Sequence, residues 1–276
     1  MMKLRILALV LLVAAAVGWY LAANLEEYFP ENKPLSVLNV VPEPATESES
    51  SRLPVPPRHP VVPLESPAVS ASVEPEALPF PTDLEGADTY LRTRLPQLLK
   101  DQKLLLLLDL NFFIQKLVLF VDHLPEQSIP RLYLPFVPPE PGFVTSGSGD
   151  QRTLGKTNML RYLAYVKLVE IIPDEVLLRL YRGLYPLFQQ AYREAGEPSG
   201  YFNDRLIVAI DDLLATPEPQ EPIALVRHIN RFRYADPDLE SRSAGQKILL
   251  RMGVENTRRV KQKLQGLREA LVRKDW

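Results

Sequence analysis

Four aromatic residues recur at helical spacing in the C-terminal half of the chain. Tyr181, Tyr185, Phe188 and Tyr192 follow one another at steps of four, three and four residues, which places them on one face of an α-helix. Each aromatic side chain removes on the order of 150–250 Å² from water when it is buried. A chain that carries this stripe has to cover it with another element. We therefore predict a helix at the centre of a packed domain, with the stripe in the core rather than in a ligand site.

Residues 180–216 also predict a second helix behind a hinge. Gly183 and Pro186 lie inside the first helix, and Pro186 predicts a kink because proline has no amide hydrogen to donate. Gly196 is expected to end this helix in the left-handed conformation. Ser199 or Asn203 is expected to cap the next helix. The predicted buried face of that helix consists of Phe202, Leu206, Ile210 and Leu213.

The N-terminal part of the chain predicts a membrane anchor. Residues 6–23 are apolar and carry no charge, and Lys3 and Arg5 precede them in a short tip, residues 1–5. A helix of this length spans a bilayer, and the positive flank is expected to stay in the cytoplasm. A cleaved signal peptide, with its site near Ala16 and Gly18, is the alternative. The anchor interpretation predicts a single-pass protein of the bacterial inner membrane with its C-terminal domain in the periplasm.

Residues 24–81 predict a disordered linker. They are rich in Pro and Glu and poor in aromatic residues, so they cannot bury enough apolar surface to offset the entropy lost on ordering. A linker of this kind would hold the following domain away from the membrane.

Residues 82–276 are predicted to form one mostly helical globular domain. It begins at a capping box of Thr82 and Glu85, with Asp83 or Asp88 as alternative caps. Residues 104–124 are apolar almost all round and predict one buried central helix. Residues 131–145 predict a short hairpin, and residues 223–234 predict a strand. The fold class is therefore mainly α with a small β element, behind a transmembrane helix and a disordered linker.

The C-terminal residues predict two packed helices with a basic surface. Ser243 and Gln246 form a capping box, and Gly253 separates the two helices. We expect these basic residues to form a solvated face. Binding of anionic envelope polymers is the alternative. Binding of nucleic acid is disfavoured, because the predicted topology places the domain outside the cytoplasm. The basic residues are Lys247, Arg251, Arg258, Arg259, Lys261 and Lys263, and the apolar stripe of the last helix is Val260, Leu264, Leu267 and Leu271.

Composition excludes several kinds of chemistry. The chain has no cysteine, which removes disulfides, thiolate metal sites and cysteine nucleophiles, and its net charge is only −2. Neither His123 nor His228 has a partner at metal-ligand spacing. Gly155, Lys156 and Thr157 resemble the end of a phosphate-binding loop, but Gly149 lies one residue too far upstream. We expect no cofactor and no metal.

A polar cluster directly behind the hinge is the candidate binding site. It comprises Tyr201, Asn203, Asp204 and Arg205. Asn203 or Asp204 can cap the helix, and Arg205 can pair with a carboxylate of another element, so a structural role comes first. The alternative is that the cluster lines a groove for a partner.

These observations favour a non-catalytic interaction or scaffold module of the envelope, which binds an envelope protein or a cell-wall polymer. The alternative function is a cell-wall-acting hydrolase. Glycoside hydrolysis needs only two well-placed acids, and the candidate acids are Glu170, Asp204 and Asp211.

Four runs of residues resemble a bacterial family catalogued as domain of unknown function 3014. They are residues 184–192, 200–206, 213–217 and 243–253. The resemblance covers the chain from about Thr82 onwards and implies a single anchor with a Pro-rich spacer. It implies no activity, cofactor or catalytic residue. Val254 departs from the family pattern, which often has proline at the start of the last helix.

Overall fold

A computed structural model describes residues 56–64, 79–99, 101–140, 142–149, 151–229 and 231–273. The predicted anchor, residues 6–23, and most of the predicted linker lie outside these ranges. Within them, no helix has the length and apolar character needed to cross a bilayer.

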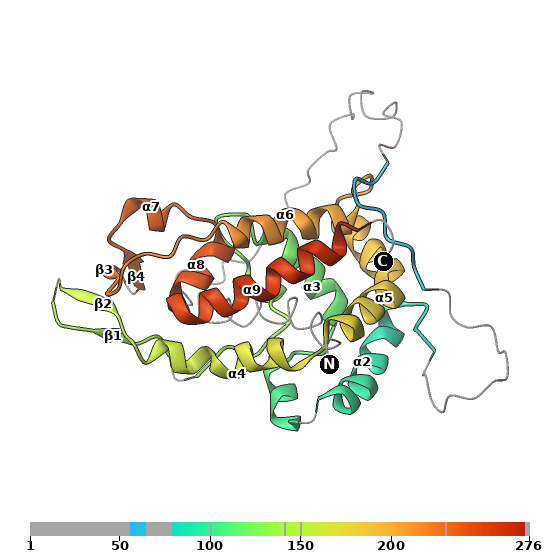
Figure 1. Ribbon diagram of the computed structural model, residues 1–276, viewed down its shortest axis with the longest axis horizontal. Coiled ribbons are helices and arrows are strands. Elements are labelled where there is room, and N and C mark those ends of the chain that lie inside the picture. Colours follow the sequence, from blue (N-terminus) through green and yellow to red (C-terminus); the bar gives the residue numbers. More distant parts are fainter. Residues whose placement is uncertain are drawn as a thin grey trace, which may run out of the picture.

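The described residues are mainly helical, with one small antiparallel sheet (Figure 1). The helices are α2 (Leu84–Leu98), α3 (Phe113–His123), α4 (Asn158–Ile171), α5 (Asp174–Glu194), α6 (Phe202–Leu214), α7 (Pro237–Glu240), α8 (Ala244–Arg251) and α9 (Val254–Leu271), with 3-10 turns η2 (Gln102–Leu107) and η3 (Arg131–Tyr133). The strands β1 (Thr145–Ser146), β2 (Arg152–Leu154), β3 (Ala224–His228) and β4 (Arg231–Tyr234) follow one another in the sheet in chain order. The predicted fold class is confirmed for this part of the chain.

Helix α3 lies at the centre of the main core. It packs against α2, α5 and α6, while α9 packs against α4 and α6. In Figure 1, α3 and α9 lie between α6 and α4, with the sheet at one end of the molecule and α5 and α2 at the other. The predicted stripes of α5, α6 and α9 are all buried, and each of their residues is at most 8% exposed. A smaller core beside the sheet contains Leu154, Ile223, Leu225, Tyr234, Leu239 and Leu250.

The single central helix predicted over residues 104–124 is wrong. The first part forms η2, and α3 begins only at Phe113. Phe112 has a left-handed backbone, φ 53°, and Asp88 of α2 accepts hydrogen bonds from the amides of Phe112 and Phe113. A side chain from another helix therefore caps α3 in the middle of the apolar run. The cap of α2 itself is Asp83, one of the predicted alternatives.

The hairpin predicted over residues 131–145 is also wrong. Phe136 instead forms an isolated bridge with Leu108, and Val137 donates its amide to the carbonyl of Leu107. The segment contains Pro135, Pro138 and Pro139. Because proline has no amide hydrogen, these residues cannot donate the backbone hydrogen bonds that a hairpin needs. The strand predicted over residues 223–234 is in fact a hairpin of β3 and β4, which turns at Ile229 with φ 52°.

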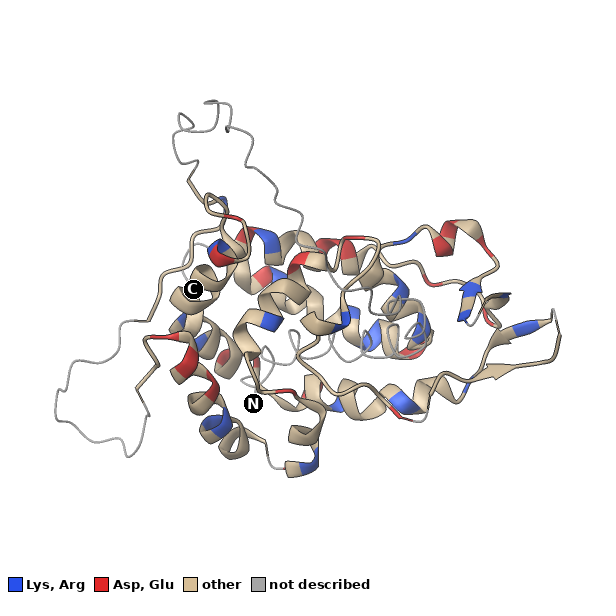
Figure 2. Ribbon diagram, turned by 180° about the vertical axis from the view of Figure 1, so that it is seen from behind, with Lys and Arg blue, Asp and Glu red and all other residues tan. Residues whose placement is uncertain are grey.

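The predicted solvated basic face near the C-terminus is largely absent from α8 and α9 as the structure describes them. Lys247, Arg251 and Lys263 are 4–6% exposed, and Lys263 pairs with Asp174 at 2.6 Å. In the ribbon of Figure 2, acidic and basic positions are interleaved along the helices rather than gathered by sign. The other three basic residues also form ion pairs, which are Arg258 with Glu218, Arg259 with Glu170, and Lys261 with Glu218.

Two described pieces of the predicted linker lie against the helices. Phe80 packs its ring on Gly183 of α5, where an added Cβ would lie 2.2 Å from Cζ of Phe80, and the same ring is 5.6 Å from that of Tyr90. This contact explains a glycine inside α5. The other piece, residues 56–64, reaches the candidate site.

Candidate functional site

The polar cluster lies at the start of α6, beside the aromatic stripe of α5. Phe202 stacks on Phe188 with parallel rings, 5.4 Å between centroids and 5° between planes. Gln189 of α5 fixes the entry into α6: its Oε1 accepts from the Phe202 amide at 3.0 Å, and its Nε2 donates to the Gly200 carbonyl at 2.8 Å. Gln189 therefore takes the capping role that was predicted for Ser199 or Asn203, and that prediction is wrong.

Asn203 is fully buried, and its side chain forms hydrogen bonds with two other groups. Its Oδ1 accepts a hydrogen bond from the Tyr181 hydroxyl at 3.0 Å. Its Nδ2 donates to the carbonyl of His59 at 2.9 Å. The side chain thus connects the aromatic stripe to residues 56–64.

Asp204 binds two successive backbone amides of the same segment. Its Oδ2 accepts from the amide of Arg58 and its Oδ1 from the amide of His59, both at 2.9 Å. Hydrogen bonds to an ionised carboxylate are stronger than bonds between neutral groups. Both carboxylate oxygens are therefore committed to this one stretch of chain.

We call residues 56–64 the strap. It runs beside α5 and the start of α6 (Figure 1, blue). Arg182 of α5 adds a further contact, from its Nε to the carbonyl of Val62 at 3.0 Å. Exposure alternates between residues 56 and 62, as expected for extended chain whose successive side chains point to opposite sides. The half-buried positions in this stretch are Pro57, His59 and Val61.

Arg205 fills the structural role predicted for it. Its guanidinium pairs with Asp122 of α3 at 2.7 Å and with Glu126 at 3.2 Å, and it also donates to the Asp122 carbonyl. The contact joins the start of α6 to the C-terminal end of α3. The prediction of a charge-assisted pair with another element is therefore confirmed.

A cleft of about 440 Å³ opens next to the strap. The strap forms one border, and residues of α6 and α9 form another, where Asp211 pairs with Arg268. Burial raises the pKa of Tyr192, which also lines the cleft, to about 12, so its hydroxyl is neutral at physiological pH. Val208 is 47% exposed there and offers apolar surface. The cleft combines apolar, aromatic and charged groups, as ligand sites do.

The sequence comparisons identify the family. A family model described as protein of unknown function (DUF3014) matches residues 113–268. The chain belongs to this family. No curated protein and no solved structure matches the chain. The DUF3014 match includes α5 and α6 with Arg182, Asn203 and Asp204, whereas the strap precedes it.

The carboxylates proposed for a hydrolase are spread over two places in this DUF3014 domain. Asp204 and Asp211 both border the cleft, but Asp204 holds the strap and Asp211 is bound to Arg268. Glu170 lies on α4 in a two-contact ion pair with Arg259, at 2.8 and 2.5 Å. Each acid is thus already engaged with a hydrogen-bond donor.

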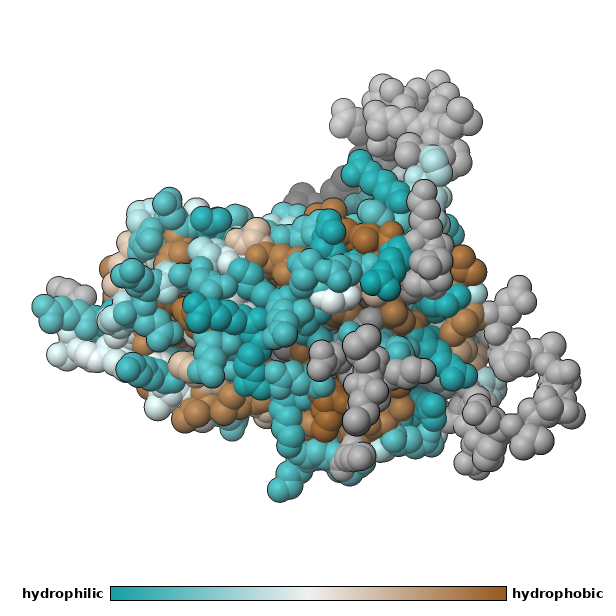
Figure 3. Space-filling view, viewed as in Figure 1, coloured by the Kyte–Doolittle hydropathy of each residue, from teal (hydrophilic) through white to brown (hydrophobic). Residues whose placement is uncertain are grey.

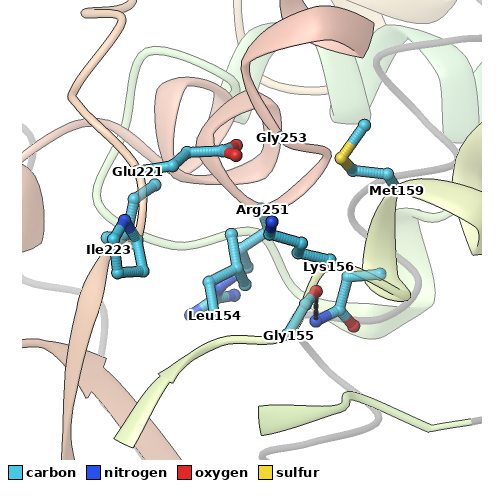
Figure 4. A pocket seen from close by; sticks show the side chains of 10 residues that line it. Leu154, Gly155, Lys156, Met159, Glu221, Ile223, Arg251 and Gly253 are labelled. Carbon is cyan, nitrogen blue, oxygen red and sulfur yellow. Dashed lines mark hydrogen bonds between the residues drawn. The ribbon is translucent and has the colours of Figure 1, made fainter. Parts of the chain in front are cut away.

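The Gly155–Thr157 turn of the DUF3014 domain borders a second, much smaller cavity (Figure 4). Its volume is about 20 Å³, which is room for about one water molecule and none for a nucleotide. Asn158 is fully buried there and donates to the carbonyl of Gly155 at 2.9 Å. Within the described residues, no group of three or more His, Asp or Glu side chains could hold a metal ion.

Sequence reasoning named the cluster but missed what binds it. Gln189, Tyr181 and Arg182 all contribute to the site from α5, and the strap comes from the predicted linker. Little in the side chains of the strap signalled this contact, because Asp204 and Asn203 bind backbone groups of Arg58 and His59.

Proposed function

We propose that this DUF3014 protein is a membrane-anchored protein of the bacterial envelope whose helical domain is a non-catalytic interaction module. The proposed anchor is residues 6–23, which cross the inner membrane. Lys3 and Arg5 precede it and favour a cytoplasmic N-terminus, so the domain after the anchor lies in the periplasm. The partner is another envelope protein, bound at the cluster and the cleft beside it.

One observation carries the proposal: the cluster already holds an extended polypeptide. Asn203, Asp204 and Arg182 bind the backbone of the strap rather than its charged side chains. A surface that pairs with main-chain groups binds polypeptide as a class, in the way that other modules recognise extended peptides. A cell-wall polymer would present hydroxyl and acetamido groups and only short peptides.

Site-specific photocrosslinking in cells tests the binding surface. A photoreactive residue at Val208, 47% exposed in the cleft, is compared with one at Val226, 46% exposed on β3 at the far end of the molecule. We expect adducts to another envelope protein from position 208 and none from position 226. Equal adduct yields at both positions, or adducts to wall polymer alone, contradict a protein-binding cleft.

Reporter fusions after Trp276 test the location separately. A reporter that is active only outside the cytoplasm is the expected result. Activity only in the cytoplasm contradicts both the orientation and the envelope role.

A further inference from the structure

The strap is bound chiefly through its own backbone. The groups that receive hydrogen bonds from or give them to the domain are the amides of Arg58 and His59 and the carbonyls of His59 and Val62. The side chains of Arg58, Pro60 and Val62 are exposed. Little in these contacts depends on which side chains the strap carries.

The positions of the prolines agree with this mode of binding. Asp204 requires two successive amide hydrogens, which Arg58 and His59 supply. Pro57 and Pro60 stand on either side, where no amide hydrogen is used. The site therefore selects an extended segment with two consecutive non-proline residues, and flanking prolines lower the entropy lost on binding.

The strap is also weakly held compared with the rest of the fold. Of its described Val and Leu side chains, Val61 alone packs against the main core, and it is only partly buried. A few hydrogen bonds have to offset the entropy of ordering the whole segment. Segments with few buried apolar contacts need little free energy to detach locally while the rest of the fold stays intact.

We infer that the strap is a displaceable ligand in cis, and that an extended, proline-flanked segment of the partner protein takes its place on Asn203 and Asp204. This inference rests on the proposed function and names the partner's chemistry and the regulation of the site. Val62 and Phe80 bind at neighbouring residues of α5, Arg182 and Gly183, so both ends of the connection 65–78 are held close to the site. A released strap stays at high local concentration, and a partner has to compete with it.

Release also changes how the domain is tethered. With the strap bound, the first described hydrogen bond from this part of the chain to the helices is that of the Arg58 amide; after release, the first contact is that of Phe80 with Gly183 of α5. Partner binding thus lengthens the connection to the anchor by the residues between these points.

Binding of a fluorescent peptide with the sequence of residues 56–64 to the full chain tests the inference. Arg58→Pro with His59→Pro removes both amide hydrogens that Asp204 binds, and both side chains lie outside the main core. We expect this release variant to bind the peptide at least tenfold more tightly than the wild type, because the cis competitor is gone. Pro63→Ala, which keeps both amides, is the matched control and should behave like the wild type.

Asp204→Asn in the release background should abolish peptide binding, whereas Asp211→Asn, on the same cleft but paired with Arg268, should not. Equal affinity of wild type and release variant, or no binding by a folded release variant, overturns the inference. Displacement of the peptide by soluble peptidoglycan fragments but not by unlabelled peptide overturns it in favour of a wall ligand.

Hydrogen exchange on the unmodified chain gives a second measurement that needs no variant to fold. Saturating peptide should remove the protection of the strap amides while α5 and α6 stay protected. Unchanged strap protection overturns the inference. Crosslinks from Val208 persist in that case if the proposed function holds, so the two failures are distinguishable.

Discussion

The side chains of Tyr181 and Asn203 are joined by a 3.0 Å hydrogen bond that connects the hydrophobic stripe of α5 to the surface of α6 that holds the strap. Burial raises the pKa of Tyr181 well above its ordinary value of 10.0, so the hydroxyl remains a donor. With Oδ1 so engaged, Asn203 turns its amide nitrogen toward the strap. The amide orientation that binds His59 is thus set from within the core.

Replacing Asn203 with alanine should destabilise the domain and loosen the strap together. The change removes one hydrogen bond of the buried Tyr181 hydroxyl and one of the His59 carbonyl, which costs about 2–3 kcal/mol. For a domain of this size, that corresponds to a fall in Tm of roughly 4–12 °C. Thermal unfolding and hydrogen exchange of the strap measure the two effects. Adding Tyr181→Phe to Asn203→Ala should cost less than the sum of the single changes, and full additivity would contradict the coupling.

Gly183→Ala should leave the free energy of unfolding unchanged in the wild type but raise it by about 1 kcal/mol once Phe80 is replaced by alanine. Alanine is the better helix former by about 1 kcal/mol, but its Cβ would lie 2.2 Å from the Phe80 ring and displace it. In a Phe80→Ala background this conflict is absent. Urea denaturation of the four variants gives the coupling energy. Gly266→Ala in α9, whose nearest neighbour would be 3.8 Å away, is the control that should stabilise in either background.

Helices with local signals could be predicted from the sequence. The stripes of α5, α6 and α9 repeat at helical spacing, and Ser243 does accept the Gln246 amide at 3.1 Å. The break before α3 could not be predicted, because the residue that makes it, Asp88, belongs to another helix. Periodicity shows which side of a helix is buried, but it does not show where a side chain from another helix caps its start.

The candidate site was predictable only in part, for a similar reason. Asn203, Asp204 and Arg205 are residue types that bind main-chain or charged groups, and their place behind a hinge identified them. The segment that Asp204 binds lies 145 residues away in the chain. Recognition through backbone groups leaves little side-chain pattern in the strap, so its composition indicated only a linker.

Gln189→Ala should destabilise α6 because it removes the acceptor of the buried Phe202 amide. The same change removes one hydrogen bond of the Tyr185 hydroxyl and one of the Gly200 carbonyl. We expect a loss of about 1–3 kcal/mol in the free energy of unfolding. The adjacent Gln190 is the matched control, since its side chain pairs with Glu194 on the exposed surface of the helix, and Gln190→Ala should change stability by less than about 0.5 kcal/mol. A Gln189→Ala variant as stable as Gln190→Ala would contradict the capping role.

Below the range in which tyrosine ionises, Tyr162→Phe and Tyr185→Phe should change the stability of the domain in opposite directions. The Tyr162 side chain is fully buried, and its hydroxyl has no hydrogen-bond partner among the described residues. Tyr162→Phe should therefore stabilise the domain by about 1 kcal/mol, whereas Tyr185→Phe, which loses a bond to Gln189, should destabilise it by about as much. Chemical denaturation at pH 8 measures both.

At alkaline pH the two substitutions should act in the same direction. Burial raises the pKa of Tyr162 and of Tyr185 from 10.0 to about 12. Above pH 10 each tyrosine loses its proton in the unfolded chain but keeps it in the folded one, so the stability present below pH 10 is lost as the pH rises towards 12. Each phenylalanine removes one such group and should reduce the loss between pH 10 and 11 by about 1 kcal/mol. Parallel stability-pH curves for wild type and Tyr162→Phe above pH 10 would show that this hydroxyl ionises as readily in the folded protein as in the unfolded chain.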